Sequence, residues 1–190
     1  APSVSSKLNK QEITTMSRSV IVDIETTGLD PDQGHRIVEI GAIDVIDGRR
    51  TGVMYQQYIN PERAMPAGAQ AVHGLSSEFL INFPVFHEII DDFLDFVGDA
   101  QLMFHNAPFD VSFLNVELGN VAYNRLNVDD VFDTKVFAEE MQQLRQHQFT
   151  PDSTSLDALC RHFNIDTTHR QIHGAIKDCE LTYRVYSKLM

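Results

Sequence analysis

The sequence of 190 residues predicts an α/β protein in which helices cover a mixed sheet around one core. Three apolar extended segments come first, and Asp47-Gly48, a strong hairpin signal, joins the second to the third. A predicted helix, a further short extended segment and four more predicted helices follow. Antiparallel strands at the start, followed by alternating strands and helices, indicate a single α/β domain.

The predicted strands are the apolar stretch that runs into DIETTG (23–28), RIVEIGAIDVI (36–46), TGVMYQQYIN (51–60), and a short segment at 101–105. The first of them places Val20, Val22 and Ile24 on one face, because successive side chains of a strand point to opposite sides. Residues 28–34, which follow it, are rich in turn-forming residues.

Five helices are expected from apolar residues at helical spacing. The clearest begins at Pro84 and ends at Gly98, with apolar residues 3, 4, 7, 8 and 11 positions after Phe86. The others are expected from about Pro108, through 134–146, over 155–163 with Ser153 or Ser155 as the N-cap, and over 174–190. Residues 60–79 are predicted to form a loop with a short helix.

Composition and charge limit the class of protein. The 43% hydrophobic and 22% charged content is ordinary for a soluble globular domain. Fifteen Lys and Arg against 27 Asp and Glu give a net charge of −12, which argues against tight, non-specific binding of duplex nucleic acid through phosphate neutralisation. An acidic pocket that recruits divalent cations remains compatible with this charge.

The polar residues 1–18 are predicted to be a flexible tail or linker, and residues 19–190 one folded domain. The sequence contains no apolar run long enough to span a membrane and no hydrophobic segment typical of a secretory signal. Cys160 and Cys179 lack metal-binding spacing and are expected to be buried and reduced. These features together predict a cytoplasmic protein.

Asp23 and Glu25 are unusual in such an apolar strand. Side chains two apart point the same way, with Cα atoms about 6.5 Å apart. Burial of two ionised carboxylates without partners costs several kcal/mol each. Neither Lys nor Arg alternates with them in this segment, so a bound metal ion is the expected partner.

Two further acids and a histidine fit the same pattern. Asp110 shares the inward stripe of its predicted helix with Phe113 and Leu114, which follow three and four residues later. Asp178 likewise lies on the apolar stripe of the last helix. His173 precedes Asp178 by five residues, about 140° around a helix, and is therefore expected in the loop or first turn beside the acid. Histidine ordinarily titrates near neutral pH, which suits it to accept a proton from water.

Four stretches carry a family resemblance: D-I-E-T-T-G (23–28), E-I-G-A (39–42), H-N-A-P-F-D (105–110) and H-G-A-I-K-D (173–178). In order and spacing this set resembles the motifs of the DEDDh (DnaQ-like) 3′→5′ exonuclease family, from residue 19 to about residue 189. The segments AVHGLSSEF and SLDALCRHFNI are most similar to its proofreading members. The resemblance implies a ribonuclease H-like fold, with a mixed five-stranded sheet flanked by helices, and exonuclease activity.

Carried over position by position, the resemblance implies roles for ten residues. Asp23, Glu25 and Asp178 would hold one divalent cation, Mg²⁺ or Mn²⁺, and Asp23 with Asp110 would hold a second one about 4 Å away. His173 would take a proton from the attacking water, and the terminal nucleotide would leave as a 5′-monophosphate. The positions at which relatives contact that nucleotide are Thr26, Thr27, Leu29, His73 and Asn106.

Alternative functions stay open at this point. A binding or scaffold domain could keep the fold without the chemistry, but the intact acids and histidine argue against it. Among enzymes, a proofreading exonuclease that acts on single-stranded or frayed DNA 3′ ends beside a polymerase subunit is the first interpretation. The others are an exonuclease domain tethered to another protein module and trimming DNA 3′ ends, for example prespacers in CRISPR adaptation, and an enzyme that trims RNA or oligonucleotides. The low content of basic residues also predicts weak, distributive action unless a partner delivers the strand end.

Several other polar residues are interpreted as structural. Asp133 and Asp157 match acidic positions of relatives, but capping or helix-surface roles are expected for them. His105 is expected to pack or to hydrogen-bond with backbone. The remaining histidines show no ligand spacing: His35, His87, His147, His162 and His169.

Overall fold

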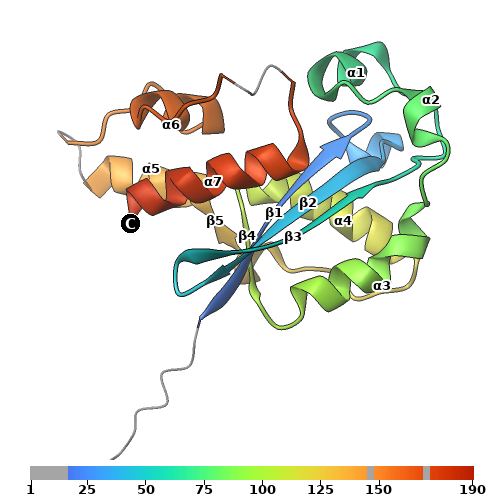
Figure 1. Ribbon diagram of the computed structural model, residues 1–190, viewed down its shortest axis with the longest axis horizontal. Coiled ribbons are helices and arrows are strands. Elements are labelled where there is room, and N and C mark those ends of the chain that lie inside the picture. Colours follow the sequence, from blue (N-terminus) through green and yellow to red (C-terminus); the bar gives the residue numbers. More distant parts are fainter. Residues whose placement is uncertain (1–16, 145–147, 169–171) are drawn as a thin grey trace, which may run out of the picture.

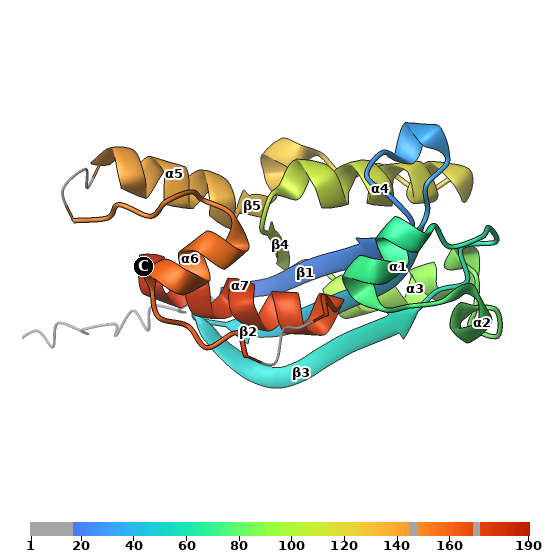
Figure 2. The same cartoon turned by 90° about the horizontal axis from the view of Figure 1, so that it is seen from above.

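A computed structural model describes residues 17–144, 148–168 and 172–190 of the chain. Apart from residues 17 and 18, the predicted tail lies outside the described residues, as do residues 145–146 of one predicted helix, His147 and His169. The described chain forms one twisted sheet with helices on both faces (Figures 1 and 2).

The sheet combines an antiparallel unit with two parallel strands. Its strands are β1 (Arg18–Thr26), β2 (Ile37–Ile46), β3 (Arg49–Tyr58), β4 (Gln101–Phe104) and β5 (Phe132–Asp133). The order β3-β2-β1-β4-β5 puts β1 in the centre, antiparallel to β2 and parallel to β4. The predicted mixed five-stranded architecture is therefore confirmed.

The predicted strands from 36 onward agree with the observed ones to within two residues at each end. Asp47 and Gly48 form the predicted hairpin, and both have positive φ, 49° and 74°, as the tight two-residue turn requires. The strand β5 was not located from the sequence, because two residues are too few to show an alternating pattern.

The helices are α1 (Ala67–His73), α2 (Ser77–Leu80), α3 (Phe86–Val97), α4 (Ala107–Asn120), α5 (Thr134–Leu144), α6 (Leu156–His162) and α7 (Ala175–Leu189), with short 3₁₀ turns at Pro31–Gln33 and Val128–Asp130. The five long predicted helices are all present. Ser155 is the N-cap of α6, because its hydroxyl accepts the N–H of Ala158 at 3.3 Å. Between the two predicted candidates, the structure thus selects Ser155.

Helices α3 and α4 cover one face of the sheet. The predicted apolar face of β1 points to them, and Val20, Val22 and Ile24 pack in the same core cluster as the inward residues of both helices. The opposite face of β1 carries Ile21, which packs with Cys179 of α7. Helices α5 and α6 pack in turn against α7 in a separate apolar cluster. Asp23 and Glu25 therefore lie on the α7 face of the central strand.

Both cysteines are free and buried, as predicted. Among the described residues, none of the helices is both long and apolar enough to cross a membrane.

Gly41 of β2 allows α7 to approach the sheet closely. A Cβ atom at Gly41 would lie 2.6 Å from the carbonyl carbon of Ala175 and 2.7 Å from the nitrogen of Ile176. Both are backbone atoms, so a larger residue at position 41 would force the start of the helix to move.

We expect Gly41→Ala to lower the free energy of unfolding by about 1–3 kcal/mol, the usual cost of overpacking a core. Gly119→Ala is the matched control, because its Cβ would make only an ordinary contact, 3.6 Å from Arg125. Urea unfolding of the two variants measures the difference. Equal stability of Gly41→Ala and the wild type would show that α7 accommodates the methyl group without displacement.

Candidate active site

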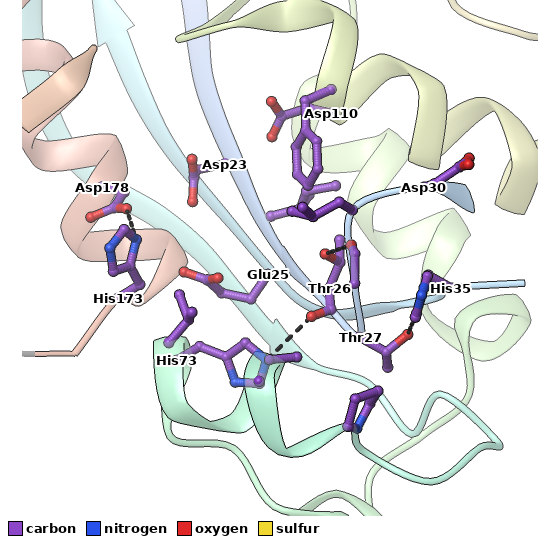
Figure 3. Close-up of a pocket in the computed structure, with 18 of the residues that line it drawn as sticks. Asp23, Glu25, Thr26, Thr27, Asp30, His35, His73, Asp110, His173 and Asp178 are labelled. Atoms are coloured by element: carbon purple, nitrogen blue, oxygen red, sulfur yellow. Dashed lines mark hydrogen bonds and ion pairs between the residues drawn. The ribbon is translucent and has the colours of Figure 1, made fainter. Parts of the chain in front are cut away.

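Two carboxylates lie on β1 beneath the start of α7. The register of β1 and β2 places Gly41 opposite Asp23 and Glu39 opposite Glu25. Residues directly opposite on antiparallel strands project to the same face, so these positions all face α7. Figure 3 shows the side chains of Asp23 and Glu25 pointing into a common space with those of Asp110 and Asp178.

Asp110 reaches this space from the first turn of α4, on the other side of β1. The start of α4 is held by Asp133 at the end of β5, whose carboxylate accepts the N–H groups of Asn106 at 3.0 Å and Ala107 at 2.9 Å. The same carboxylate accepts the N–H of Lys135 at the start of α5, at 2.9 Å. Asp133 therefore has the capping role expected from the sequence, and it fixes the helix that carries Asp110.

Asp178 and His173 come from α7 and from the loop before it. Asp178 is buried in the first turn of the helix, and His173 lies two residues before the helix begins, as predicted. Nδ1 of His173 is 3.3 Å from Oδ2 of Asp178, and the imidazole remains 40% exposed. The ring thus lies beside the acid and remains accessible to solvent.

Helix α1 makes hydrogen bonds to two segments that carry site residues, the end of β1 and the loop before α7. The N–H of His173 donates to the carbonyl of Val72 at 3.1 Å. Nδ1 of His73 accepts the N–H of Leu75 at 3.1 Å, so its Nε2 carries the proton and donates to the carbonyl of Thr26 at 3.2 Å. The last turn of α1 therefore joins the end of β1 to the loop that carries His173, as the position of α1 in Figure 2 shows.

The carboxylates repel one another. The pKa of Asp23 is raised well above its ordinary value, first by loss of hydration and then by the negative charges of Asp110, Asp178 and Glu25. Burial also raises the pKa of Asp110 well above its ordinary value. Burial lowers the pKa of His73, which favours the neutral ring that its two backbone contacts require. Without a cation, the cluster therefore resists complete ionisation.

The donor set fits a divalent cation. Glu25, His173 and Asp178 each offer one ligand atom, and these atoms lie within 4.8 Å of one another. Asp23 and Asp110 add two carboxylates whose pKa values are raised by burial, and a nearby positive charge would favour their ionised forms. A site dominated by carboxylate oxygens suits Mg²⁺ or Mn²⁺.

The acids open into a pocket of about 770 Å³. None of the described residues that line it is Lys or Arg, whereas Leu29, Val72, Phe109 and Leu156 give it apolar walls. A phosphate group in this pocket would therefore find no Lys or Arg side chain among the described lining residues. Bound cations are consequently the expected source of positive charge.

His35 is a pocket residue that the sequence interpretation missed. Its Nδ1 lies 3.0 Å from the hydroxyl oxygen of Thr27, which also accepts the N–H of Arg36 at 3.0 Å. A Cβ atom at Gly28 would lie 2.4 Å from the His35 ring, so the imidazole packs directly on the glycine of the DIETTG motif. The only sequence signal for this contact was Gly28, a residue without a side chain that leaves room for a neighbouring ring. The spacing between histidines could not reveal that His35 packs there.

Nine of the ten predicted site residues line this pocket, and Asn106 is the exception. Asn106 is exposed and has a φ of 73°, and its Oδ1 lies 3.4 Å from Nζ of Lys135. The hydroxyl of Thr26 donates to the carbonyl of Gly28 at 2.6 Å, so it is already engaged within the loop.

His105 also lines the pocket, but Nδ1 contacts the hydroxyl of Thr134 at 2.8 Å and Nε2 contacts the carbonyl of Thr154 at 3.1 Å. This agrees with the structural role expected for it. Asp157 lies exposed on the first turn of α6, a helix-surface position as expected.

A mixed sheet of this order, with four carboxylates from β1, α4 and α7 and a histidine around one pocket, defines an exonuclease of the DEDDh type. The family described as Exonuclease (RNase_T) matches residues 20–186. DNA polymerase III subunit epsilon of Rickettsia felis is 49% identical over 175 residues, 90% of this chain and 73% of that protein. The Escherichia coli K12 subunit of the same name is 36% identical over 179 residues, 91% of this chain and 71% of that protein.

The chain therefore belongs to this exonuclease family, and within it to the DnaQ-like proofreading 3′→5′ exonucleases, a metal-dependent type. The tethered CRISPR-type alternative is not favoured by these relatives.

Solved structures support the fold. An E. coli exonuclease I–ssDNA complex has a TM-score of 0.78 at 18% identity, with 92% of this chain covered and 40% of that chain. The nuclease domain of 3′hExo, a DEDDh family member bound to rAMP, has a TM-score of 0.73 at 15% identity, with 93% and 92% covered. The ribonuclease H-like fold implied by the resemblance is confirmed.

Proposed function

We propose that this domain removes nucleotides from DNA 3′ ends at a centre made of Asp23, Glu25, Asp110, Asp178 and His173, using two Mg²⁺ or Mn²⁺ ions. The observation that carries the proposal is the convergence of these side chains, from β1, α4 and α7 with the loop before it, on one pocket that has no Lys or Arg among its described lining residues. Asp23, Glu25 and Asp178 would hold one ion, and Asp23 with Asp110 the other.

The bound cations would supply the positive charge that stabilises the attacking and leaving oxygens of the phosphodiester. The role of the protein side chains is positioning and proton transfer. His173, held beside Asp178 and 40% exposed, accepts the proton of the attacking water. The acids, fixed by β1 and by the first turns of α4 and α7, would hold the cations that bring the scissile phosphate into register with that histidine.

The apolar walls of the pocket suit the terminal nucleotide. Leu29 is 85% exposed on the loop after β1, and Val72 of α1 is 47% exposed, although both line the pocket. Exposed apolar side chains beside a polar centre are suited to packing against the face of a base, because this contact removes apolar surface from water. Thr26, Thr27 and His73 would support this surface through the contacts that shape the loop and α1.

Leu29→Ala is expected to raise KM for a single-stranded oligonucleotide about tenfold, because burying a leucine side chain is worth about 1.5–3 kcal/mol, while kcat and the melting temperature change little. Steady-state kinetics measure the effect. Ile81→Ala is the control, since Ile81 is also exposed, at 66%, but does not line the pocket. Equal KM values for the two variants would argue against a nucleotide contact at Leu29.

A polymerase partner is part of this proposal. The relatives at 36–49% identity are named as subunits of DNA polymerase III. With 15 basic residues against 27 acidic ones, the domain has few groups with which to follow a DNA backbone alone. A polymerase that holds the primer end would raise its effective concentration at this pocket.

The test is digestion of matched 5′-labelled single-stranded DNA and RNA with Mg²⁺, with Mn²⁺, and with a chelator. We expect stepwise shortening of DNA from the 3′ end, release of 5′-monophosphates, and no reaction with the chelator. Faster digestion of RNA, or activity that persists without divalent cations, would contradict the proposal.

A further inference from the structure

Glu39 is a buried carboxylate that the proposed chemistry does not use. It lies on β2 directly opposite Glu25, and it is only 2% exposed. Like charges directly opposite one another on paired strands are destabilising, and burial raises the pKa of Glu39 above its ordinary value. An acid retained in such a place needs compensating contacts.

Glu39 has two such contacts, one to each side. Oε1 accepts a hydrogen bond from the side-chain amide of Gln56 on β3 at 2.8 Å. Oε2 accepts the backbone N–H of Ala175, the first residue of α7, at 3.3 Å. The carboxylate therefore connects the neighbouring strand with the start of the helix that carries Asp178.

Helix α7 depends on an acceptor from outside its own sequence. Its N-cap residue is Gly174, which has no side chain to accept the N–H groups of the first turn. Glu39 supplies an acceptor from the sheet instead, and a negative group at a helix N-terminus is favourable.

Two positions of β2 act on the same residue. Glu39 bonds to the N–H of Ala175, while Gly41, two residues along on the same face, leaves the space into which the backbone of Ala175 fits. The strand register puts Glu39 opposite Glu25 and Gly41 opposite Asp23. The E-I-G stretch thus fixes α7 directly across from the two acids of β1.

We infer that Glu39 is a positioning residue that sets the metal-binding geometry through Ala175, without itself binding metal or substrate. Asp178 lies three residues after Ala175 on the same side of the helix, and His173 two residues before it. Loss of the Glu39 contact would release the first turn of α7 and separate Asp178 from Glu25. This inference rests on the proposed role of those acids.

The test separates two properties of the Glu39 side chain, its length, which allows the contact with Ala175, and its negative charge. Glu39→Gln keeps an oxygen within reach of Ala175 but removes the charge, and Gln56 can present its own oxygen after an amide flip. Glu39→Asp keeps the charge but is one methylene too short. Asp44→Asn is the matched control, because Asp44 is a buried acid of the same strand that pairs with Arg18 on the opposite face.

Mn²⁺ binding by calorimetry, without substrate, is the primary measurement, with the fold verified by thermal unfolding. We expect Glu39→Asp to weaken Mn²⁺ affinity and kcat by about 10- to 100-fold, the usual effect of losing a group that orients a metal ligand. Glu39→Gln should recover most of this affinity, to within about threefold of the wild type. Asp44→Asn should lower stability alone, and Glu39→Met replaces Glu39→Asp if the latter does not fold.

Wild-type affinity in folded Glu39→Asp would overturn the inference. So would an equal loss in Glu39→Gln, because it would show that the charge acts and not the contact with Ala175. A wild-type protein that takes up no Mn²⁺ would overturn the proposed site itself, and the inference with it. If the wild type takes up Mn²⁺ normally and folded Glu39→Asp does so with the same affinity, the inference fails while the proposed site stands.

Discussion

Asp23→Asn is expected to abolish exonuclease activity, by about a thousandfold or more, and at the same time to stabilise the metal-free protein. The loss follows because Asp23 is the residue proposed to contact both cations, whose charge stabilisation is worth several kcal/mol. The gain follows because burial, and then the charges of the neighbouring carboxylates, raise the pKa of Asp23 and make its ionised form unfavourable in the folded protein. Activity and stability should therefore change in opposite directions.

The size of the stability effect depends on pH. In the folded protein the pKa of Asp23 lies well above its ordinary value of 3.8, so the folded state retains the proton more tightly than the unfolded state does. The stability that this gives is complete below pH 3.8 and is lost as the pH rises through the folded pKa. The asparagine variant has no such loss, so its advantage should grow from about pH 4 upward.

Urea unfolding at several pH values, with and without Mn²⁺, measures this prediction. Saturating Mn²⁺ should stabilise the wild type and have little effect on Asp23→Asn, because a ligand stabilises the state that binds it. Asp44→Asn is the control, since it loses an ion pair of 2.6 Å with Arg18 and should be less stable and remain active. A metal-free Asp23→Asn protein less stable than the wild type would show that burial and charge repulsion at Asp23 do not destabilise the folded state.

The acids themselves were predictable because local periodicity decides which face a side chain occupies. Asp23 and Glu25 alternate with apolar residues on a strand, and Asp110 and Asp178 fall on apolar helical stripes, so their inward direction followed from spacing. The order of these segments along the chain then matched a known family. The fold and the carboxylate cluster could both be predicted on this basis.

Contacts between distant segments were not predictable in the same way. The bond from Ala175 to Glu39 joins residues 136 positions apart, and the packing of His35 on Gly28 depends on how one loop closes. Asn106 was expected in the pocket from its motif, but its positive φ and its contacts with Asp133 and Lys135 leave it outside the pocket lining. Periodicity predicts which face of a helix or strand a side chain occupies. A contact between distant segments can be predicted only when the position of the other segment is known.

His173→Gln is expected to lower kcat by about 10²- to 10⁴-fold, the usual contribution of a general base, while KM stays within about threefold. Glutamine keeps a hydrogen-bonding group beside Asp178 but cannot accept a proton from water at neutral pH. His87→Ala is the control, because His87 is exposed on α3, on the opposite face of the sheet.

The same variant distinguishes two roles that the geometry allows for His173. The ring offers an atom within 4.8 Å of ligand atoms of Glu25 and Asp178, so it could bind the cation directly. A ligand role predicts that Mn²⁺ affinity falls together with kcat in His173→Gln. A base role predicts nearly normal Mn²⁺ affinity and the loss of one ionisation from the pH dependence of kcat. We expect the second result for two reasons. The contact of Nδ1 with Asp178 at 3.3 Å places the imidazole beside the acids, and the 40% exposure of the ring leaves it accessible to water.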